Sequence, residues 1–275
     1  MRWEDGRESD NVEDRRGFPI GGRGAGLGCG GLILLLLISW ITGINPARLL
    51  DSVQQTPQAP PPAQPGPAGG PPRDTLGKFA SVVLASTEDV WTEIFRQNGR
   101  TYVAPKLVLF TQAARSGCGI AQTEVGPFYC PVDQKVYLDL SFFQELSQRF
   151  GASGDFADAY VVAHEIGHHV QNSLGVFERY GRNPDNAASV RIELQADCYA
   201  GVWGHNAGKL IEPGDFEEGL KAAAAIGDDR LQRLGRGYVQ PESFTHGSSQ
   251  DRVAWLRRGL TSGDPGQCDT FGGPR

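Results

Sequence analysis

The sequence lacks an excess of positive charge. Its 26 Lys and Arg residues stand against 32 Asp and Glu residues, which gives a formal net charge of -6. Proteins that bind nucleic acid through the phosphate backbone carry a basic patch or stripe. The acidic balance therefore predicts that nucleic acid is not a partner of this protein.

Cysteine is sparse, and none of the five Cys residues forms a C-x-x-C pair, which disfavours a cysteine-rich zinc site. Cys29 lies in an apolar run, and the other four make an even set downstream, for which an oxidising compartment predicts disulfides. Cys118 and Cys130 bracket a short loop that contains glycine, and they are the first expected pair. Cys198 with Cys268 would then attach the C-terminal tail to a core helix. The alternative is four free, buried thiols.

One long apolar run is present. Residues 27–44 carry no charge, and with Ala25 and Gly26 they are long enough to cross a bilayer, which predicts a transmembrane helix over residues 25–45. A cleaved signal peptide is one alternative, although no clean small-x-small cleavage site follows the run. A twin-arginine export signal at Arg15–Arg16 is the other.

Arginine residues predict the orientation of this span. Several Arg residues precede it and only Arg48 follows closely, so the positive-inside rule predicts a cytoplasmic segment over residues 1–24. The chain after the span would lie outside the cytoplasm, in the periplasm or at the cell surface. The expected protein is thus single-pass, with the lipid bilayer as a partner through residues 25–45.

A run rich in Pro, Gly, Ala and Gln, residues 46–73, cannot build a core and predicts a semi-rigid spacer. The remaining residues, 74–275, are expected to form one helix-dominated α+β domain. The expected helices cover residues 74–98 (as one or two helices), 142–150, 155–174, 187–208, 215–234 and 249–260, and the expected strands cover residues 106–110, 128–130 and 135–138.

Histidine is scarce, with five residues in the chain, yet two of them stand in His164-Glu165-Ile166-Gly167-His168. Two His at positions i and i+4 project from one face of a helix, so both imidazoles can reach one Zn²⁺. The Glu between them can take a proton from a zinc-bound water, as in H-E-x-x-H metallopeptidases. The competing interpretation is an ordinary helix that carries two surface histidines.

A catalytic zinc usually takes three protein ligands, so a third must come from elsewhere. A metzincin would have Gly and His three and six residues after His168, but Gln171 and Leu174 occupy those positions. His169 is excluded because position i+5 points about 140° away from His164 around the helix. The remaining source is a carboxylate on a later helix.

Glu193 is that candidate, in the run Glu193-Leu194-Gln195-Ala196-Asp197. Asp197 lies four residues further on, faces the same way, and is expected to accept the other ring N–H of a ligating His, with His164 preferred. The alternative is a helix with two solvated carboxylates. The apolar residues on nearly all sides of this run argue against it, because buried carboxylates need partners.

The combination of H-E-x-x-H with a later E-x-x-x-D resembles the gluzincin metallopeptidases, which include thermolysin and the prenyl-protein and heat-shock membrane proteases. It implies a small gluzincin-like zincin domain. Over nearly its whole length the chain also resembles the bacterial family named putative neutral zinc metallopeptidase, which implies a membrane-tethered zinc protein. The motifs that carry this second resemblance are Arg2-Trp3, Asn11-Val12-Glu13-Asp14-Arg15-Arg16-Gly17, Gly126-Pro127-Phe128-Tyr129-Cys130-Pro131, Tyr137-Leu138-Asp139 and His164-Glu165-Ile166-Gly167-His168-His169-Val170-Gln171.

Thr245-His246, with Arg252 further on, resembles the Thr-His-Pro…Arg element of the membrane-protease gluzincins, although Gly247 replaces the proline. This resemblance implies that His246 donates a hydrogen bond to the oxyanion of a tetrahedral intermediate, or occupies the open zinc position in a resting form. The alternative is a His that caps the helix expected to begin near Ser249.

These residues together predict a zinc-dependent metalloendopeptidase. Zinc held by His164, His168 and Glu193 would lower the pKa of its water to about 7, and Glu165 would take the proton and deliver it to the leaving amine. A strand near Tyr129 or Val136 is expected to pair with an extended peptide or protein substrate. The alternatives are a non-catalytic, membrane-tethered zinc-binding or scaffold protein and a zinc amidase that acts on an amide of the cell envelope.

Overall fold

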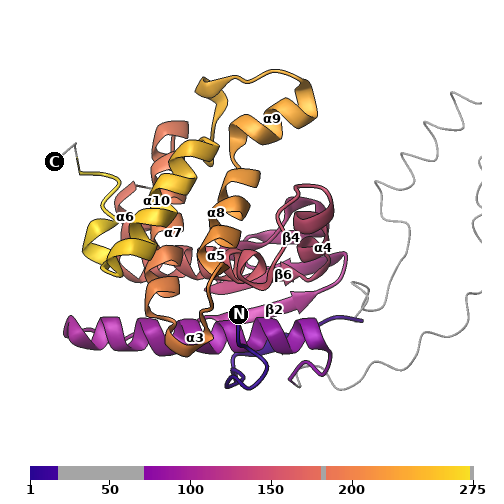
Figure 1. Cartoon of the computed structure of the whole chain (residues 1–275), viewed down its shortest axis with the longest axis vertical. Coiled ribbons are helices and arrows are strands. Elements are labelled where there is room, and N and C mark those ends of the chain that lie inside the picture. The colour runs from indigo at the N-terminus through magenta and orange to yellow at the C-terminus, as the bar shows by residue number, and fades with distance from the viewer. Residues whose placement is uncertain (18–70, 181–183, 273–275) are drawn as a thin grey trace, which may run out of the picture. The chain divides into compact units, whose positions relative to one another are not determined.

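The computed structural model describes residues 1–17, 71–180 and 184–272. Met1–Arg16 and Ala68–Arg275 form one compact unit, coloured along the chain in Figure 1. The predicted transmembrane helix over residues 25–45 and the predicted spacer up to residue 70 lie outside the described residues. The fold class is confirmed as helix-rich α+β.

A four-stranded sheet has the order β1-β2-β6-β5, and these strands are β1 (Val12–Asp14), β2 (Lys106–Phe110), β6 (Lys135–Asp139) and β5 (Phe128–Cys130). β1, β2 and β6 are parallel, whereas β5 pairs antiparallel with β6 and forms one edge. A separate hairpin joins β3 (Ala113–Ser116) to β4 (Gly119–Gln122). The three expected strands are confirmed, while β1 and the hairpin were not expected.

Eight α-helices are described: α3 (Thr75–Gln97), α4 (Ser141–Gln148), α5 (Asp155–Ser173), α6 (Val176–Tyr180), α7 (Asn186–Asn206), α8 (Asp215–Ala225), α9 (Asp228–Arg236) and α10 (Ser249–Ser262). In Figure 1, α3 runs along one side of this unit, and α5, α7, α8 and α10 stack beyond it. Side chains of Asp74, Asp185 and Ser248 accept hydrogen bonds from backbone N–H groups in the first turns of α3, α7 and α10, which explains where these helices begin.

The prediction of one helix over residues 215–234 is wrong, because the helical conformation is interrupted between α8, which ends at Ala225, and α9, which begins at Asp228. Gly227 lies so close to the start of α10 that a Cβ atom built on it would stand 2.4 Å from the backbone nitrogen of Ser249. The side chain of Asp229 then accepts a hydrogen bond from the same Ser249 N–H at 2.7 Å. Aspartate that bonds to the backbone in this way favours a helix start over a helix interior.

The N-terminal segment, residues 1–16, is part of the folded unit. β1 pairs with β2, and the Leu107 N–H donates to the Asn11 carbonyl at 2.9 Å while the Arg15 N–H donates to the Leu109 carbonyl at 2.8 Å. Ahead of β1, the indole ring of Trp3 packs edge-on against Phe79 of α3. The predicted domain over residues 74–275 is therefore incomplete.

Glu88 of α3 shows why this segment is needed, since this acidic residue is only 8% exposed. It accepts hydrogen bonds from the Ser9 hydroxyl at 2.6 Å, the Asn11 amide at 2.8 Å and the Arg7 guanidinium at 3.2 Å. A buried carboxylate is costly unless it is paired and hydrogen-bonded. The segment before β1 supplies these partners.

This packing does not fit the predicted topology, in which residues 1–24 lie on one side of a membrane and residues 74–275 on the other. A single crossing would place the bilayer between two hydrogen-bonded strands, β1 and β2. Residues 1–16 and 71–272 therefore belong on the same side of any membrane.

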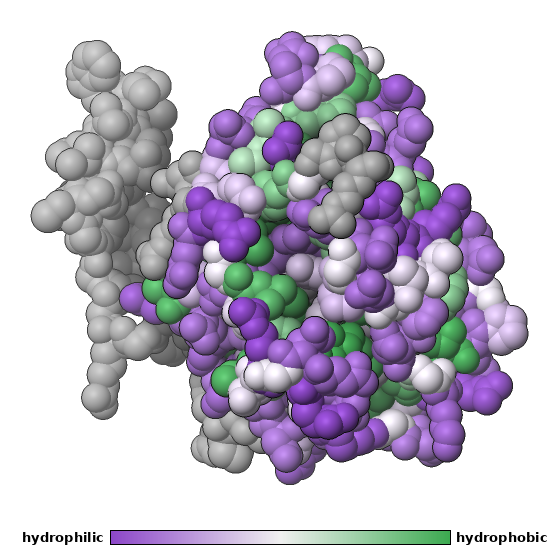
Figure 2. Space-filling view, turned by 90° about the vertical axis from the view of Figure 1, so that its left-hand side faces the viewer, coloured by the Kyte–Doolittle hydropathy of each residue, from purple (hydrophilic) through white to green (hydrophobic). Residues whose placement is uncertain are grey.

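Within the three described ranges, no helix is long and apolar enough to span a membrane. Large exposed apolar side chains are spread over separate elements, for example Leu76 on α3, Ile120 on β4 and Leu234 on α9. Figure 2 shows one face on which hydrophobic side chains lie in patches among hydrophilic ones. Scattered apolar exposure of this kind is normal for a folded surface.

Cysteine labelling tests the same-side arrangement. Single Cys residues at the exposed positions Glu8 and Arg257, each in a Cys29→Ser background, should react alike with a membrane-impermeant maleimide in cells whose cytoplasmic membrane is intact. Both should label before membrane disruption, or both only after it. Labelling of one position before disruption and the other only afterwards would show that the two parts lie on opposite sides.

Candidate active site

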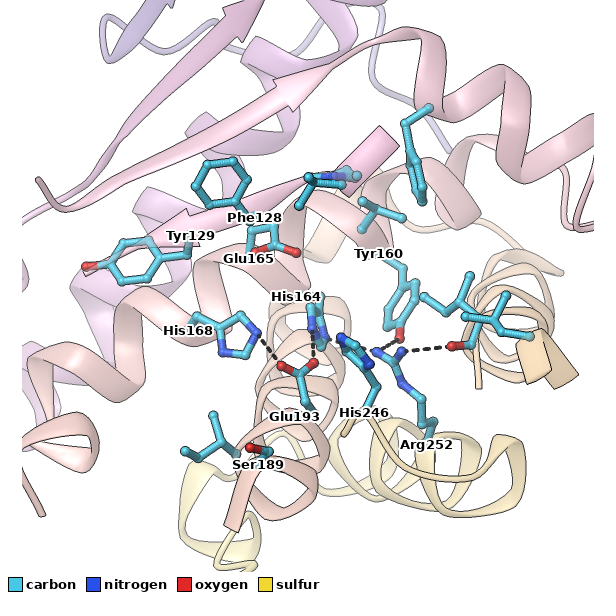
Figure 3. A pocket seen from close by; sticks show the side chains of 18 of the residues that line it. Phe128, Tyr129, Tyr160, His164, Glu165, His168, Ser189, Glu193, His246 and Arg252 are labelled. Carbon is cyan, nitrogen blue, oxygen red and sulfur yellow. Dashed lines mark hydrogen bonds and ion pairs between the residues drawn. The ribbon is translucent and has the colours of Figure 1, made fainter. Parts of the chain in front are cut away.

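The metal site forms where α5 and α7 cross at close range. Gly167 lies at the contact, and a Cβ atom on it would stand 2.9 Å from the Ala196 carbonyl oxygen and 3.1 Å from its Cα. The absence of a side chain at this position lets the two helix backbones approach each other. As a result, Glu193 of α7 reaches His164 and His168 of α5, and Figure 3 shows its carboxylate facing both rings.

The distances fit a zinc site. The Nε2 atom of His164 lies 3.1 Å from Glu193 Oε2, and the Nε2 atom of His168 lies 3.5 Å from Glu193 Oε1. One ligand atom from each of the three residues lies within 4.8 Å of the others. Tetrahedral zinc with ligand bonds of 2.0–2.2 Å holds its ligand atoms roughly 3.3 Å apart. The two-nitrogen, one-oxygen donor set is also one that zinc accepts in catalytic sites.

Asp197 hydrogen-bonds to the ring nitrogen of His164 that does not face the metal site, as expected. The Nδ1–H of His164 donates to Asp197 Oδ1 at 2.9 Å, which leaves Nε2 for the metal. Burial by itself disfavours a charged His164, but the hydrogen bonds and charges of Asp197 and Glu193 raise its pKa to about 10. Zinc must therefore displace a proton from His164 when it binds.

Arg252 of α10 and Tyr160 of α5 complete this buried cluster. Arg252 donates to Asp197 through Nε at 2.8 Å and through Nη2 at 2.9 Å, and the Tyr160 hydroxyl donates to Asp197 at 2.6 Å. Burial alone would raise the pKa of Asp197, but Arg252 and His164 hold it at about 2. Asp197 thus stays ionised and able to accept from His164.

His169 points away from His164 and His168, and both of its ring nitrogens are bound elsewhere. Its Nε2–H donates to the Val103 carbonyl at 2.7 Å, and its Nδ1 accepts from the Tyr129 hydroxyl at 3.1 Å. The same hydroxyl accepts from the Asn172 amide at 3.0 Å. These bonds attach the edge strand β5 to α5, the helix that carries the metal ligands.

A cleft of about 760 Å³ opens over the metal site and is lined by His164, Glu165, His168, Glu193 and His246. Glu165 is 7% exposed and lies on the same turn as the two His ligands. The cleft wall is largely aromatic and aliphatic, with Phe128, Phe142, Phe150, Phe177, Val161, Ile226, Leu231 and Leu234. This size and lining are typical of a site that binds an organic ligand.

His246 lies in the connection between α9 and α10, and Figure 3 shows it beside Glu193 and Arg252. Oδ2 of Asp228 accepts from the backbone N–H groups of Thr245, His246 and Gly247 at 2.6–3.0 Å, which fixes the connection. Asp228 also lies 3.3 Å from the His246 ring, and this contact raises the pKa of His246. The imidazole is 53% exposed and faces the cleft.

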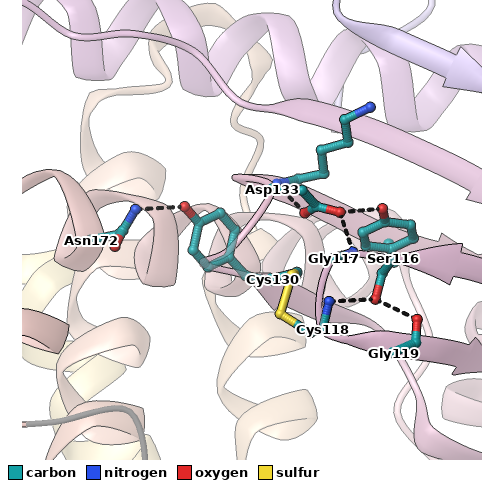
Figure 4. Close-up of a disulfide and its surroundings, with 10 residues drawn as sticks. Ser116, Gly117, Cys118, Gly119, Cys130, Asp133 and Asn172 are labelled. Atoms are coloured by element: carbon teal, nitrogen blue, oxygen red, sulfur yellow. Dashed lines mark hydrogen bonds between the residues drawn. A yellow bond between two sulfur atoms is a disulfide. The ribbon is translucent and has the colours of Figure 1, made fainter.

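Both expected disulfides are present. Cys118 is bonded to Cys130 with a Cα–Cα distance of 5.8 Å, and Cys198 is bonded to Cys268 with a Cα–Cα distance of 5.6 Å. The first joins the hairpin β3–β4 to β5, as Figure 4 shows, and Asp133 binds the Gly117 N–H beside it. The second attaches the C-terminal tail to α7.

Sequence reasoning missed several residues of this site. Tyr160, Gln171 and Gln195 were given no role, although each makes hydrogen bonds to the ligands or to the groups that hold them. Asp228, which binds the His246 segment, was also given none. Arg252 was noted only as part of the sequence that resembles the Thr-His-Pro…Arg element, without a contact to Asp197. The one sequence signal for Gln171 and Gln195 is a polar residue on a strongly apolar helix. This signal does not show which groups the two side chains bind.

A helix-rich α+β unit with a His–His–Glu metal site at the base of a cleft defines a metalloprotein. The chain belongs to the family described as putative neutral zinc metallopeptidase, whose model matches residues 1–271. That match includes the N-terminal segment packed against α3. The family and the donor set identify the metal as Zn²⁺.

Two relatives are similar to this chain. It is 50% identical to the uncharacterized protein YpfJ of Escherichia coli (strain K12), over 99% of both chains. It is also 50% identical to the uncharacterized protein Rv2575 of Mycobacterium tuberculosis (strain H37Rv), over 62% of this chain and 63% of that protein. No solved structure matches the chain.

Replacing Glu193 by Gln tests the third ligand. The variant keeps the shape of the side chain but loses the charge, so zinc affinity should fall by more than about 100-fold, since loss of even an outer partner of a ligand costs 10–100-fold. Competition with a chromophoric chelator measures this affinity. Glu178→Gln on the exposed face of α6 is the control and should bind zinc as the wild type does. Unchanged affinity in Glu193→Gln would remove Glu193 from the ligand set.

Proposed function

We propose that this protein is a zinc-dependent metalloendopeptidase that hydrolyses peptide bonds in the cleft over His164, His168 and Glu193. The observation that carries the proposal is the position of Glu165. This carboxylate lies on the same helical turn as two metal ligands and lines the same cleft. A purely structural zinc site has no use for such a group.

His164, His168 and Glu193 would hold zinc, which would supply a Lewis acid that lowers the pKa of a water molecule to about 7. Glu165 accepts the proton of the attacking water and then delivers it to the leaving amine, as a general base and general acid. Asp197 keeps the Nε2 atom of His164 directed at the metal throughout. Arg252 keeps Asp197 ionised, because its guanidinium binds both carboxylate oxygens.

We assign His246 the role of stabilising the oxyanion. Asp228 fixes its backbone and raises its pKa, so the ring is more readily a charged donor at neutral pH. A donor directed at developing negative charge contributes most when it is fixed in advance. In our proposal the ring donates to the former carbonyl oxygen of the scissile bond.

β5 is the strand proposed to bind the substrate. It is the sheet edge beside the cleft, where Phe128 and Tyr129 line the wall. An extended peptide can add to such an edge through backbone hydrogen bonds. Val136 is not available for this role, because β6 already pairs with β2 on one side and β5 on the other.

Two disulfides support a place in an oxidising compartment, which agrees with an extracytoplasmic domain. Since residues 1–16 fold with the domain, we propose the same extracytoplasmic location for these N-terminal residues. Attachment to a bilayer through residues 25–45 stays a proposal from the sequence.

Glu165→Gln is the direct test of function. The full chain is needed, because residues 1–16 belong to the fold. Wild type and variant should bind zinc equally, while cleavage of an unfolded protein or a peptide library should fall by about 10²–10⁴-fold without the general base. Glu217→Gln on the exposed face of α8 is the matched control and should cleave normally.

The alternatives give different results in the same assay. A scaffold protein would bind zinc and cleave nothing in either form. A cell-envelope amidase would release amide-linked fragments from envelope material in a Glu165-dependent way, yet leave peptides intact. Equal cleavage by wild type and Glu165→Gln would contradict the proposed role of Glu165.

His246→Ala separates transition-state stabilisation from substrate binding. Loss of a fixed oxyanion donor should lower kcat by about 10²-fold and leave KM nearly unchanged. His205→Ala, at the far end of α7, provides the comparison and should retain kcat. An unchanged kcat in His246→Ala would show that this ring does not contact the reacting atoms.

A further inference from the structure

Gln171 occupies the position at which a metzincin would have glycine, and its side chain binds the second histidine ligand, His168. It lies three residues after His168, on the same face of α5. The Nδ1–H of His168 donates to Gln171 Oε1 at 2.8 Å. Gln171 has no exposed surface, so no solvent competes for this bond.

The direction of this bond is fixed by two backbone carbonyls, which can only accept. The Gln171 amide nitrogen donates to the Ile192 carbonyl at 2.7 Å and to Gln195 Oε1 at 3.0 Å. Gln195 in turn donates to the Cys268 carbonyl at 2.9 Å. If either amide were turned over, an oxygen would face a carbonyl oxygen, and a buried acceptor would lose its donor.

The last acceptor in this series of hydrogen bonds, the Cys268 carbonyl, belongs to a disulfide-bonded residue. Gln195 and Cys198 lie three residues apart on α7, so they share a face. Cys198 holds the side chain of Cys268, while Gln195 binds its carbonyl. Cys198 and Cys268 are fully buried, and Gln195 is 6% exposed. The disulfide therefore positions one of the two carbonyls that fix the direction of these hydrogen bonds, and the Ile192 carbonyl is the other.

We propose that Gln171 and Gln195 are positioning residues of the zinc site, and that the Cys198–Cys268 disulfide anchors them. The chain from the Cys268 carbonyl through Gln195 and Gln171 keeps the proton of His168 on Nδ1. Nε2 then carries the free lone pair that binds zinc. Asp197 and Arg252 do the same for His164 by ionic contacts, so the two His ligands are held by two different kinds of support.

This inference rests on the zinc site and not on the peptidase activity, so zinc affinity is the readout. Gln171→Met keeps the length of the side chain but removes the acceptor, and the affinity should fall by about 10–100-fold. Gln195 contacts no metal ligand, yet Gln195→Met should lower the affinity by about threefold to tenfold, because it removes one of the two acceptors that hold the Gln171 amide.

A double-mutant cycle distinguishes a connected chain from two separate effects. If Gln195 acts through Gln171, then Gln195→Met should cause no further loss of zinc affinity in the Gln171→Met background. Independent effects would instead add. The His168 Nδ1–H resonance of ¹⁵N-histidine-labelled, zinc-loaded protein provides a second readout. It should be visible in the wild type and lost to solvent exchange in Gln171→Met.

Matched controls separate positioning from general loss of structure. Gln144→Met, on the exposed face of α4, should leave zinc affinity and the resonance unchanged. Paired Ser substitutions at Cys198 and Cys268 should lower the zinc affinity as Gln195→Met does, whereas the same change at Cys118 and Cys130 should leave the zinc affinity unchanged. Normal zinc affinity in Gln171→Met would overturn the proposal, as would additive losses in the cycle.

Discussion

The buried carboxylate of Asp197 is the interaction on which the rest of the site depends. It has no exposed surface, and it binds His164 of α5, Arg252 of α10 and Tyr160 at once. Breaking a buried ion pair leaves an uncompensated charge and costs about 3–5 kcal/mol. The three helices must therefore meet at this point, and that meeting places one zinc ligand in its working orientation.

Close backbone contact is what makes this meeting possible. Gly167 brings α5 against α7, and Gly259 brings α10 against α7, where a Cβ atom would stand 2.0 Å from the Cys198 carbonyl oxygen. With larger residues at these positions, Glu193 would stand further from the two His rings. The glycine inside the metal motif thus has a packing role beside the chemical roles of its neighbours.

Sequence reasoning recovered what depends on local spacing. The ligands on α5, the pair Glu193 and Asp197, and most helix bounds follow from i, i+4 geometry, caps and apolar periodicity. The two disulfides were expected on other grounds, from an even number of downstream cysteines in an oxidising compartment. It failed where distant segments meet. β1 was missed because a three-residue strand is defined by its partner, and the break at Gly227 was missed because Ser249 of another helix causes it.

The sequence by itself determined the zinc chemistry, because two His and one Glu between them lie within one helical turn and need no distant contact to be recognised. Only the tertiary structure decided how the ligands are held and that residues 1–16 fold together with the domain that carries the site. Hydrogen bonds such as that from Gln195 to Cys268, or from Asn11 to Glu88, join residues far apart in the chain. No periodicity encodes such contacts, since they arise from packing.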